Sequence, residues 1–136
     1  MTNYNYDFDG INRQFNIHIP ASYNANTDTL PLVLFLHGMG GNMSNFSGLS
    51  YKSDAEKFIM VVPQALVDPQ VNKTAWHSGA GGTIGGLTYY INQNVNDVGF
   101  LSSLIDTISK WYSVDADRVF STGFSMGGYM SNRLKQ

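Results

Sequence analysis

The sequence predicts an α/β fold in which an antiparallel hairpin leads into a mostly parallel sheet flanked by helices. Two observations carry this prediction: a period-two hydrophobic pattern near the N-terminus, and later apolar strand candidates that alternate with helical segments. With 136 residues, 43% hydrophobic and 13% aromatic, the chain is long enough to bury a core. We therefore expect one domain over residues 1–136.

The first predicted element is a β-hairpin. Residues 4–8 and 15–19 each alternate apolar and polar side chains, and Asp9-Gly10 lies between them. An Asp-Gly pair between alternating segments is a strong short-range hairpin signal. His18 has the opposite parity to the apolar residues of its strand, so we expect it to face solvent.

Two continuous apolar runs follow, at residues 32–36 and 58–62. Both are too short for helices, which is typical of strands buried on both faces of a sheet. The segment 49–57 between them predicts a helix. Together they indicate a strand, helix, strand crossover with parallel strands.

Residues 64–96 are polar and rich in glycine, and we expect no regular core element from them. Loops of this length commonly form lids or site walls. Asp97 then predicts a helix N-cap, because apolar side chains recur after it at spacings of three and four. This expected core stripe comprises Val98, Leu101, Ile105, Ile108 and Tyr112.

After an expected turn at 115–117, residues 118–124 predict a strand and 129–136 a helix, and Gly123-Phe124-Ser125-Met126-Gly127 joins them. A sharp strand-to-helix turn exposes a serine hydroxyl at the cost of a strained backbone. The glycines two positions before and after Ser125 fit a turn too tight for side chains there, and Gly128 is expected to let the helix pack close to the sheet. Ser125 is the candidate nucleophile.

The same turn supplies candidate donors for an oxyanion hole. A helix beginning after Ser125 directs free amides toward the reacting oxygen, and the Met126 amide is the natural first donor. The second donor should come from the glycine-rich segment after the first apolar run, His37 to Gly41. Met39 is the first choice and Gly40 the alternative.

Taken together, the sequence resembles the polyhydroxybutyrate depolymerase and feruloyl esterase group of the α/β-hydrolase superfamily. The similar segments are 31–41, 61–64, Trp76, 97–100 and 115–130. The resemblance implies a secreted Ser-Asp-His hydrolase that acts on small-molecule or polymer esters without a cofactor. The N-terminal residues show no signal peptide, so localisation stays open.

The position of Ser125 near the end of the chain departs from this pattern. In α/β-hydrolases the acid and the histidine follow the serine in chain order, whereas this sequence ends at Gln136. We therefore expect a domain truncated after the nucleophile turn, weakly active or inactive alone, with an exposed sheet edge that favours self-association. Of the histidines present, His37 is expected to support its loop, and His77 to line the substrate mouth with Trp76.

Composition excludes several other functions. The net charge is −2 and no window concentrates Lys or Arg, so we expect neither nucleic acid nor an anionic membrane as a partner. No stretch reaches the about 18 apolar residues of a membrane span. Without cysteine and without an HExxH motif, no metal site is expected. Neither glycine cluster fits a dinucleotide-binding or P-loop pattern.

The leading hypothesis is a serine ester hydrolase of the carboxylesterase, feruloyl esterase or hydroxyalkanoate depolymerase type, with Ser125 as nucleophile. One alternative is a catalytically inactive binding module or pseudoenzyme. Another is a different acyl hydrolase on the same fold, such as a peptidase or a dienelactone hydrolase, because the serine turn alone does not distinguish these classes.

Overall fold

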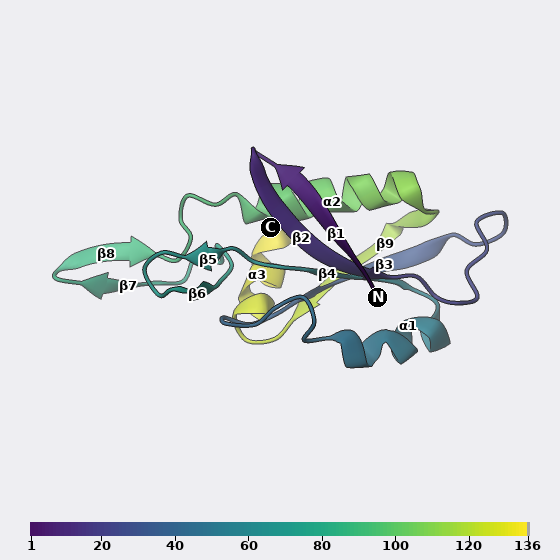
Figure 1. The fold of residues 1–136 in the computed structure, drawn as a ribbon, viewed down its shortest axis with the longest axis horizontal. Coiled ribbons are helices and arrows are strands. Elements are labelled where there is room, and N and C mark those ends of the chain that lie inside the picture. Colours follow the sequence, from purple (N-terminus) through teal and green to yellow (C-terminus); the bar gives the residue numbers. More distant parts are fainter. Residues whose placement is uncertain (136) are drawn as a thin grey trace.

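The computed structural model describes residues 1–135, apart from the side chain of Ile84, and is built on a five-stranded sheet in the order β1-β2-β4-β3-β9 (Figure 1). Strands β1 and β2 are antiparallel, β2 is antiparallel to β4, and β4, β3 and β9 are parallel. The predicted fold class is therefore confirmed. The strands are β1 Thr2–Phe8, β2 Ile11–His18, β3 Leu30–Leu36, β4 Ile59–Pro63 and β9 Val114–Gly123.

The hairpin forms as predicted, with Phe8 opposite Ile11. Asp9 and Gly10 both have positive φ, 53° and 72°, as a two-residue turn matching the strand twist requires. The sequence predicts that His18 faces solvent, but its side chain is only 19% exposed, and its Nε2 is 3.0 Å from the carboxylate of Asp54, in the helix of residues 50–56.

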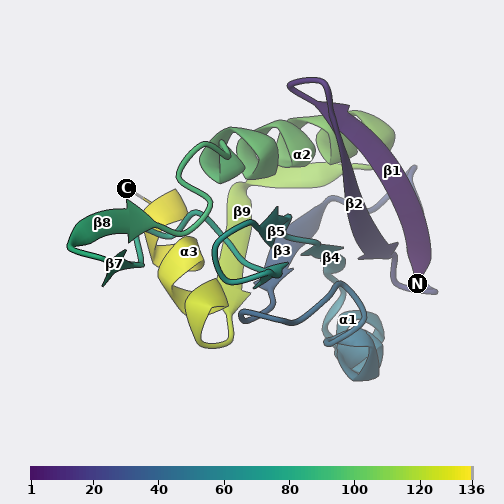
Figure 2. The same ribbon diagram turned by 60° about the vertical axis from the view of Figure 1, so that its left-hand side comes forward.

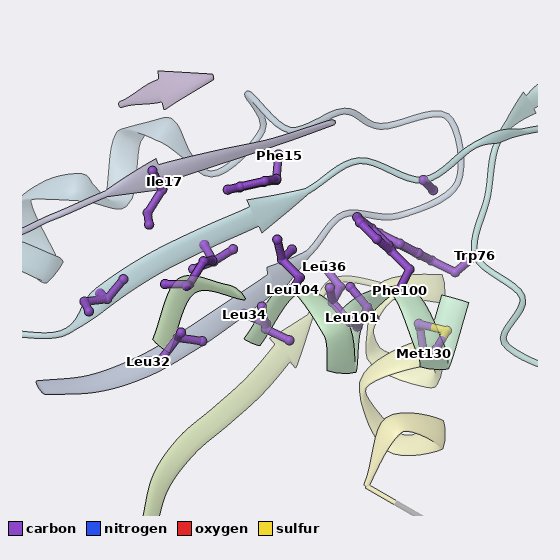
Figure 3. Packing of buried hydrophobic residues seen from close by; sticks show 14 of the residues in the cluster. Phe15, Ile17, Leu32, Leu34, Leu36, Trp76, Phe100, Leu101, Leu104 and Met130 are labelled. Carbon is purple, nitrogen blue, oxygen red and sulfur yellow. The ribbon is translucent and has the colours of Figure 1, made fainter. Parts of the chain in front are cut away.

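Helices cover both faces of the sheet (Figures 1 and 2). Leu32, Leu34 and Leu36 of β3 are fully buried in the main core, beside α2 and α3 (Figure 3). The alternate residue Phe35 contacts Phe46 and Phe58 on the opposite face, where α1 lies. The helices are η1 Ser47–Leu49, α1 Ser50–Glu56, α2 Asp97–Trp111 and α3 Met126–Leu134, and none of the described helices is long and apolar enough to cross a membrane. Gln136, the end of the last predicted helix, lies outside the described residues.

The predicted orientation of α2 is partly wrong. The stripe expected from the sequence includes Val98, which is 36% exposed, and omits Phe100 and Leu104, which are fully buried. The spacing of the apolar residues fits two neighbouring stripes on this helix. Packing against the sheet decides which of the two stripes is buried. The N-cap is Asn96, whose side chain accepts a hydrogen bond from the Gly99 amide, and not Asp97.

Residues 64–96 add no strand to the central sheet, as expected, but the sequence did not indicate the short strands and core contacts that they form. They form two short antiparallel pairs, β5 Val67–Asp68 with β6 Lys73–Thr74, and β7 Gly81–Ile84 with β8 Leu87–Tyr90, the second of which projects from the body (Figure 2). Ala75, Trp76 and Ile91 from this segment are buried in the core. The sequence hides these contacts, because the apolar residues lie in short groups without the period of a helix or of a core strand.

The turn expected at 115–117 lies within β9 as an irregularity. The pairing shifts from Leu30 opposite Val114 to Leu32 opposite Val119. Between these points the Asp115 carboxylate accepts a hydrogen bond from the Asp117 amide. The strand bulges there and then continues to Gly123.

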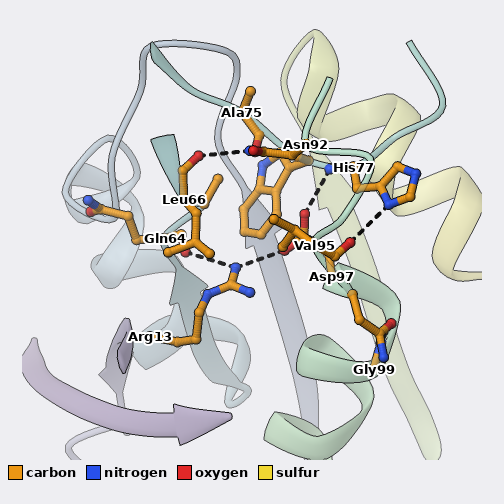
Figure 4. A network of polar contacts seen from close by, with 12 residues as sticks. Arg13, Gln64, Leu66, Ala75, His77, Asn92, Val95, Asp97 and Gly99 are labelled. Atoms are coloured by element: carbon orange, nitrogen blue, oxygen red, sulfur yellow. Dashed lines mark hydrogen bonds and ion pairs between the residues drawn. The ribbon is translucent and has the colours of Figure 1, made fainter. Parts of the chain in front are cut away.

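A buried ion pair joins β2 to the start of α2 (Figure 4). Arg13 is 1% exposed, its Nη2 lies 2.8 Å from Asp97 Oδ1, and its guanidinium stacks on Phe100 at 3.9 Å. The other Asp97 oxygen accepts the His77 amide at 2.7 Å. Because the charge on Asp97 is buried, it requires both partners.

Arg13→Leu should lower the free energy of unfolding by about 3–5 kcal/mol, because it leaves the Asp97 carboxylate buried without its counter-charge. Arg118→Leu, which breaks an exposed pair with Asp115, is the matched control and should change stability by less than about 1 kcal/mol. Urea denaturation measures both. Equal losses in the two variants would contradict this assignment.

Candidate active site

Ser125 occupies the turn between β9 and α3 and adopts φ 55°, ψ −116°. A non-glycine residue in this region of φ/ψ space is strained, and surrounding structure must hold it there. Its side chain is exposed. Strand β9 runs through a tight turn into α3 (Figure 2), and this turn presents the Ser125 hydroxyl at the surface on a rigid support.

Two glycines make this turn sterically feasible. A Cβ at Gly123 would collide with the backbone of Gly127, and a Cβ at Gly127 would collide with the Leu36 carbonyl at the end of β3. The close approach predicted for these positions is therefore present. The role predicted for Gly128 is wrong, because a Cβ there would lie 3.4 Å from the Gly123 oxygen, an ordinary contact.

The first turn of α3 leaves one amide without a partner. The Gly127 amide donates to the Phe124 carbonyl and the Gly128 amide to the Ser125 carbonyl, both at 2.9 Å. Among the described residues the Met126 amide has no acceptor. The Met126 side chain is buried, so only the backbone amide of this residue is available to bind a substrate oxygen.

The glycine loop, residues 38–41, lies directly beside this turn. A Cβ at Gly38 would be 3.6 Å from the Ser125 Cβ. The Gly40 amide donates to the Thr74 carbonyl at 2.8 Å, so it is not free to serve as the alternative oxyanion donor. Of the two predicted loop amides, the Met39 amide is the one without an acceptor among residues 1–135.

His37 supports the glycine loop, as the sequence predicts. Its side chain is 1% exposed, Nδ1 lies 2.7 Å from the Gly38 carbonyl, and Nε2 lies 3.1 Å from the Ala65 amide. A carbonyl only accepts and an amide only donates, so the ring is neutral with its proton on Nδ1. Burial lowers the pKa of His37, which favours this neutral form. Neither ring nitrogen is free to activate Ser125.

The structure corrects the role expected for Trp76. Its side chain has no exposed surface, and Nε1 donates to the His37 carbonyl at 2.8 Å. Trp76 is therefore a core residue beneath the glycine loop and does not line a substrate mouth. A buried indole generally needs such a partner, but the sequence does not reveal which carbonyl supplies it.

His77 lies away from the glycine loop. Its Nδ1 donates to the Val95 carbonyl at 2.9 Å (Figure 4). It lines a crevice of about 220 Å³ with residues 93–98 and Arg133, and neither Ser125 nor the glycine loop borders that crevice. The third histidine, His18, lies beside Asp54, and none of the three histidine rings hydrogen bonds to Ser125 among the described residues.

A second cavity, of about 440 Å³, opens beside the serine turn. It is lined by His37, the glycine loop, Asn45, Phe46 and Phe124. Phe124 is 72% exposed although it immediately precedes the serine, and Phe46 packs against Phe35 in a tilted arrangement with ring centroids 5.5 Å apart. Sequence reasoning did not single out either phenylalanine. An exposed aromatic side chain at the mouth of a cavity is typical of a binding surface.

A strained serine at a strand-to-helix turn, free helix amides and a glycine loop on a mixed sheet together define an α/β-hydrolase. In the described part of the chain no group of His, Cys, Asp or Glu side chains could hold a metal ion. The chain belongs to the phospholipase/carboxylesterase family, whose sequence profile matches residues 19–135.

Individual relatives agree with this family. Feruloyl esterase D of Neurospora crassa is 29% identical over 94% of this chain and 42% of its own length. Poly(3-hydroxyalkanoate) depolymerase C of Paucimonas lemoignei is 28% identical over 88% of this chain and 27% of its own length. A poly(3-hydroxybutyrate) depolymerase structure from Bordetella parapertussis shares the fold with a TM-score of 0.72 at 19% identity, covering 98% of this chain and 45% of that one. The chain spans less than half the length of these relatives.

Gly127→Ala should disrupt the serine turn, because its Cβ would meet the Leu36 carbonyl, which cannot move without displacing β3. We expect a loss of stability of about 2 kcal/mol or more, in the range of strained backbone positions. Gly128→Ala is the matched control and should be neutral or slightly stabilising. Thermal unfolding of both variants measures the difference, and equal behaviour would refute the close approach at Gly127.

The buried neutral form of His37 should make stability depend on pH. Because its folded pKa lies below 6.5, the unfolded chain binds the proton first, so stability is fully present above pH 6.5 and falls as the pH drops below it. The carboxylates with lowered pKa, such as Asp68, lose their contribution only below about pH 4. The free energy of unfolding between pH 7 and 5 should therefore slope less in His37→Gln than in the unmodified protein. Parallel slopes would contradict the prediction.

Proposed function

We propose that this protein hydrolyses carboxylic esters with Ser125 as the nucleophile. The observation that carries this proposal is the strained Ser125 backbone beside two free amides, those of Met126 and Met39. Strain at one exposed serine, maintained by glycines at both sides, is difficult to explain by folding alone.

In the proposed reaction the Ser125 Oγ attacks the ester carbonyl carbon, and its proton passes to a general base. The carbonyl oxygen becomes negatively charged, and the Met126 and Met39 amides stabilise it by hydrogen bonds. The C–O bond to the alcohol then breaks, and the alcohol leaves with the proton. Water next attacks the acyl-serine, which releases the acid and restores Ser125. In the chain order of this fold, the base and its orienting acid would follow Ser125.

We further propose that the cavity beside Ser125 receives the acyl group of the ester. Phe46 and Phe124 supply aromatic walls, which suit a planar aromatic acyl group by stacking. The relative from Neurospora crassa is a feruloyl esterase, and that from Paucimonas lemoignei a hydroxyalkanoate depolymerase. Comparing kcat/KM for methyl ferulate with that for an alkyl 3-hydroxybutyrate ester distinguishes the two substrate classes, and a peptide amide and a dienelactone extend the panel to other acyl hydrolases.

Ser125→Ala should lower kcat on the best ester by about 10⁴-fold or more, because a triad serine acts as part of a unit. Ser102→Ala, at an exposed position of α2, is the matched control and should leave kcat unchanged. A fluorophosphonate should label the unmodified protein at Ser125, as peptide mass spectrometry would show. Absence of both labelling and hydrolysis would favour the pseudoenzyme alternative.

A further inference from the structure

The middle of the glycine loop is held by a single residue outside it, Thr74. The Thr74 carbonyl accepts the Gly40 amide at 2.8 Å, and the Thr74 Oγ1 donates to the Gly41 carbonyl at 2.6 Å. Thr74 is the last residue of the short strand β6. Thr74 thus contacts two successive loop residues, Gly40 through its backbone carbonyl and Gly41 through its side-chain hydroxyl.

The ends of the loop have anchors of their own. Before it, the His37 carbonyl accepts the Trp76 indole at 2.8 Å. After it, the Met43 amide donates to Gln64 Oε1 at 3.2 Å, and the Met43 carbonyl accepts Asn16 Nδ2 at 3.0 Å. Removing the Thr74 hydroxyl would therefore free the Gly41 carbonyl, while both ends of the loop and the backbone hydrogen bond between Gly40 and Thr74 stay in place.

Gly41 closes the short segment that sets the direction of the Met39 amide. Gly40 adopts φ +80°, and glycine backbone moves easily between conformations unless it is held. An oxyanion donor is effective only when it is aimed before the reaction begins. Thr74 does not line the cavity beside Ser125, so any influence on catalysis must pass through the loop.

We propose that Thr74 is a positioning residue, whose hydroxyl aims the Met39 amide at the developing oxyanion by holding Gly41. This inference rests on the proposed function, because it assumes that Ser125 attacks an ester carbonyl. It assigns to β6, which the sequence does not mark as a functional element, the task of organising half of the oxyanion hole.

Thr74→Val removes the hydroxyl and keeps the shape of the side chain. We expect kcat to fall by about 10-fold with KM within about twofold, a smaller loss than the 10²–10³-fold of deleting an oxyanion donor outright. Thr74→Ser restores the hydroxyl and should recover most of kcat. Thr88→Val on β8, an exposed threonine away from the loop, is the matched control and should be unchanged.

A transition-state analogue separates positioning from general destabilisation. A trifluoromethyl ketone forms a tetrahedral adduct with the serine whose oxyanion occupies the same hole, so its Ki should rise about 10-fold in Thr74→Val, in parallel with the loss of kcat. The thermal midpoint should stay within a few degrees of the unmodified protein. If Thr74→Val does not fold, Thr74→Ala removes the same hydroxyl without a new methyl group and replaces it in the comparison.

Unchanged kcat and Ki in Thr74→Val, or a loss in Thr74→Ser as large as in Thr74→Val, would overturn the proposal. These outcomes apply only if the unmodified protein is labelled at Ser125 and hydrolyses an ester. Failure of that labelling and hydrolysis would instead refute the proposed function. The two failures are therefore distinguishable in one set of assays.

Discussion

The site depends on the contact between the serine turn and the end of β3. The Phe124 amide donates to the Leu36 carbonyl at 3.1 Å, and Gly127 approaches that same carbonyl so closely that no side chain fits. Because β3 and β9 are parallel, both end at the same edge of the sheet. This places the serine turn and the glycine loop after β3 side by side, and the strain at Ser125 is maintained by that packing.

The segment 64–77 forms a second layer that holds the glycine loop from beneath. Ala65, Thr74 and Trp76 each hydrogen bond to the loop or to His37. The segment is itself tied to α2, since the His77 amide donates to Asp97, which pairs with Arg13. Buried polar groups must be satisfied, so these hydrogen bonds join the core to the site, and Figure 4 shows the part of this network that runs from Arg13 through Asp97 to His77.

Much of the framework could be predicted because its signals are local. Asp9-Gly10 is compatible with few turns, which indicates the hairpin. The runs at 32–36 and 58–62 have no polar face, which indicates buried strands. The glycines around Ser125 indicate one tight turn. The errors concern the buried face of α2, its cap, Trp76 and Gly128. For the buried face of α2 and for Trp76 the deciding partners are distant in sequence, as His37 is from Trp76, and no local pattern identifies them. The cap and Gly128 depend on contacts within five residues, with Gly99 and Gly123 respectively, whose geometry appears only in the folded backbone.

The sequence by itself determined the order of the strands and helices, the mixed character of the sheet and the identity of the candidate nucleophile. These follow from hydrophobic periodicity and from backbone geometry within a few residues of each position. Only the tertiary structure decided that the Gly40 amide is occupied while the Met39 amide is free, that Trp76 is buried, and that Thr74 braces the glycine loop. The physical reason is that hydrogen bonding and burial depend on groups that folding brings together from separate segments, and this proximity is not encoded in any one of them.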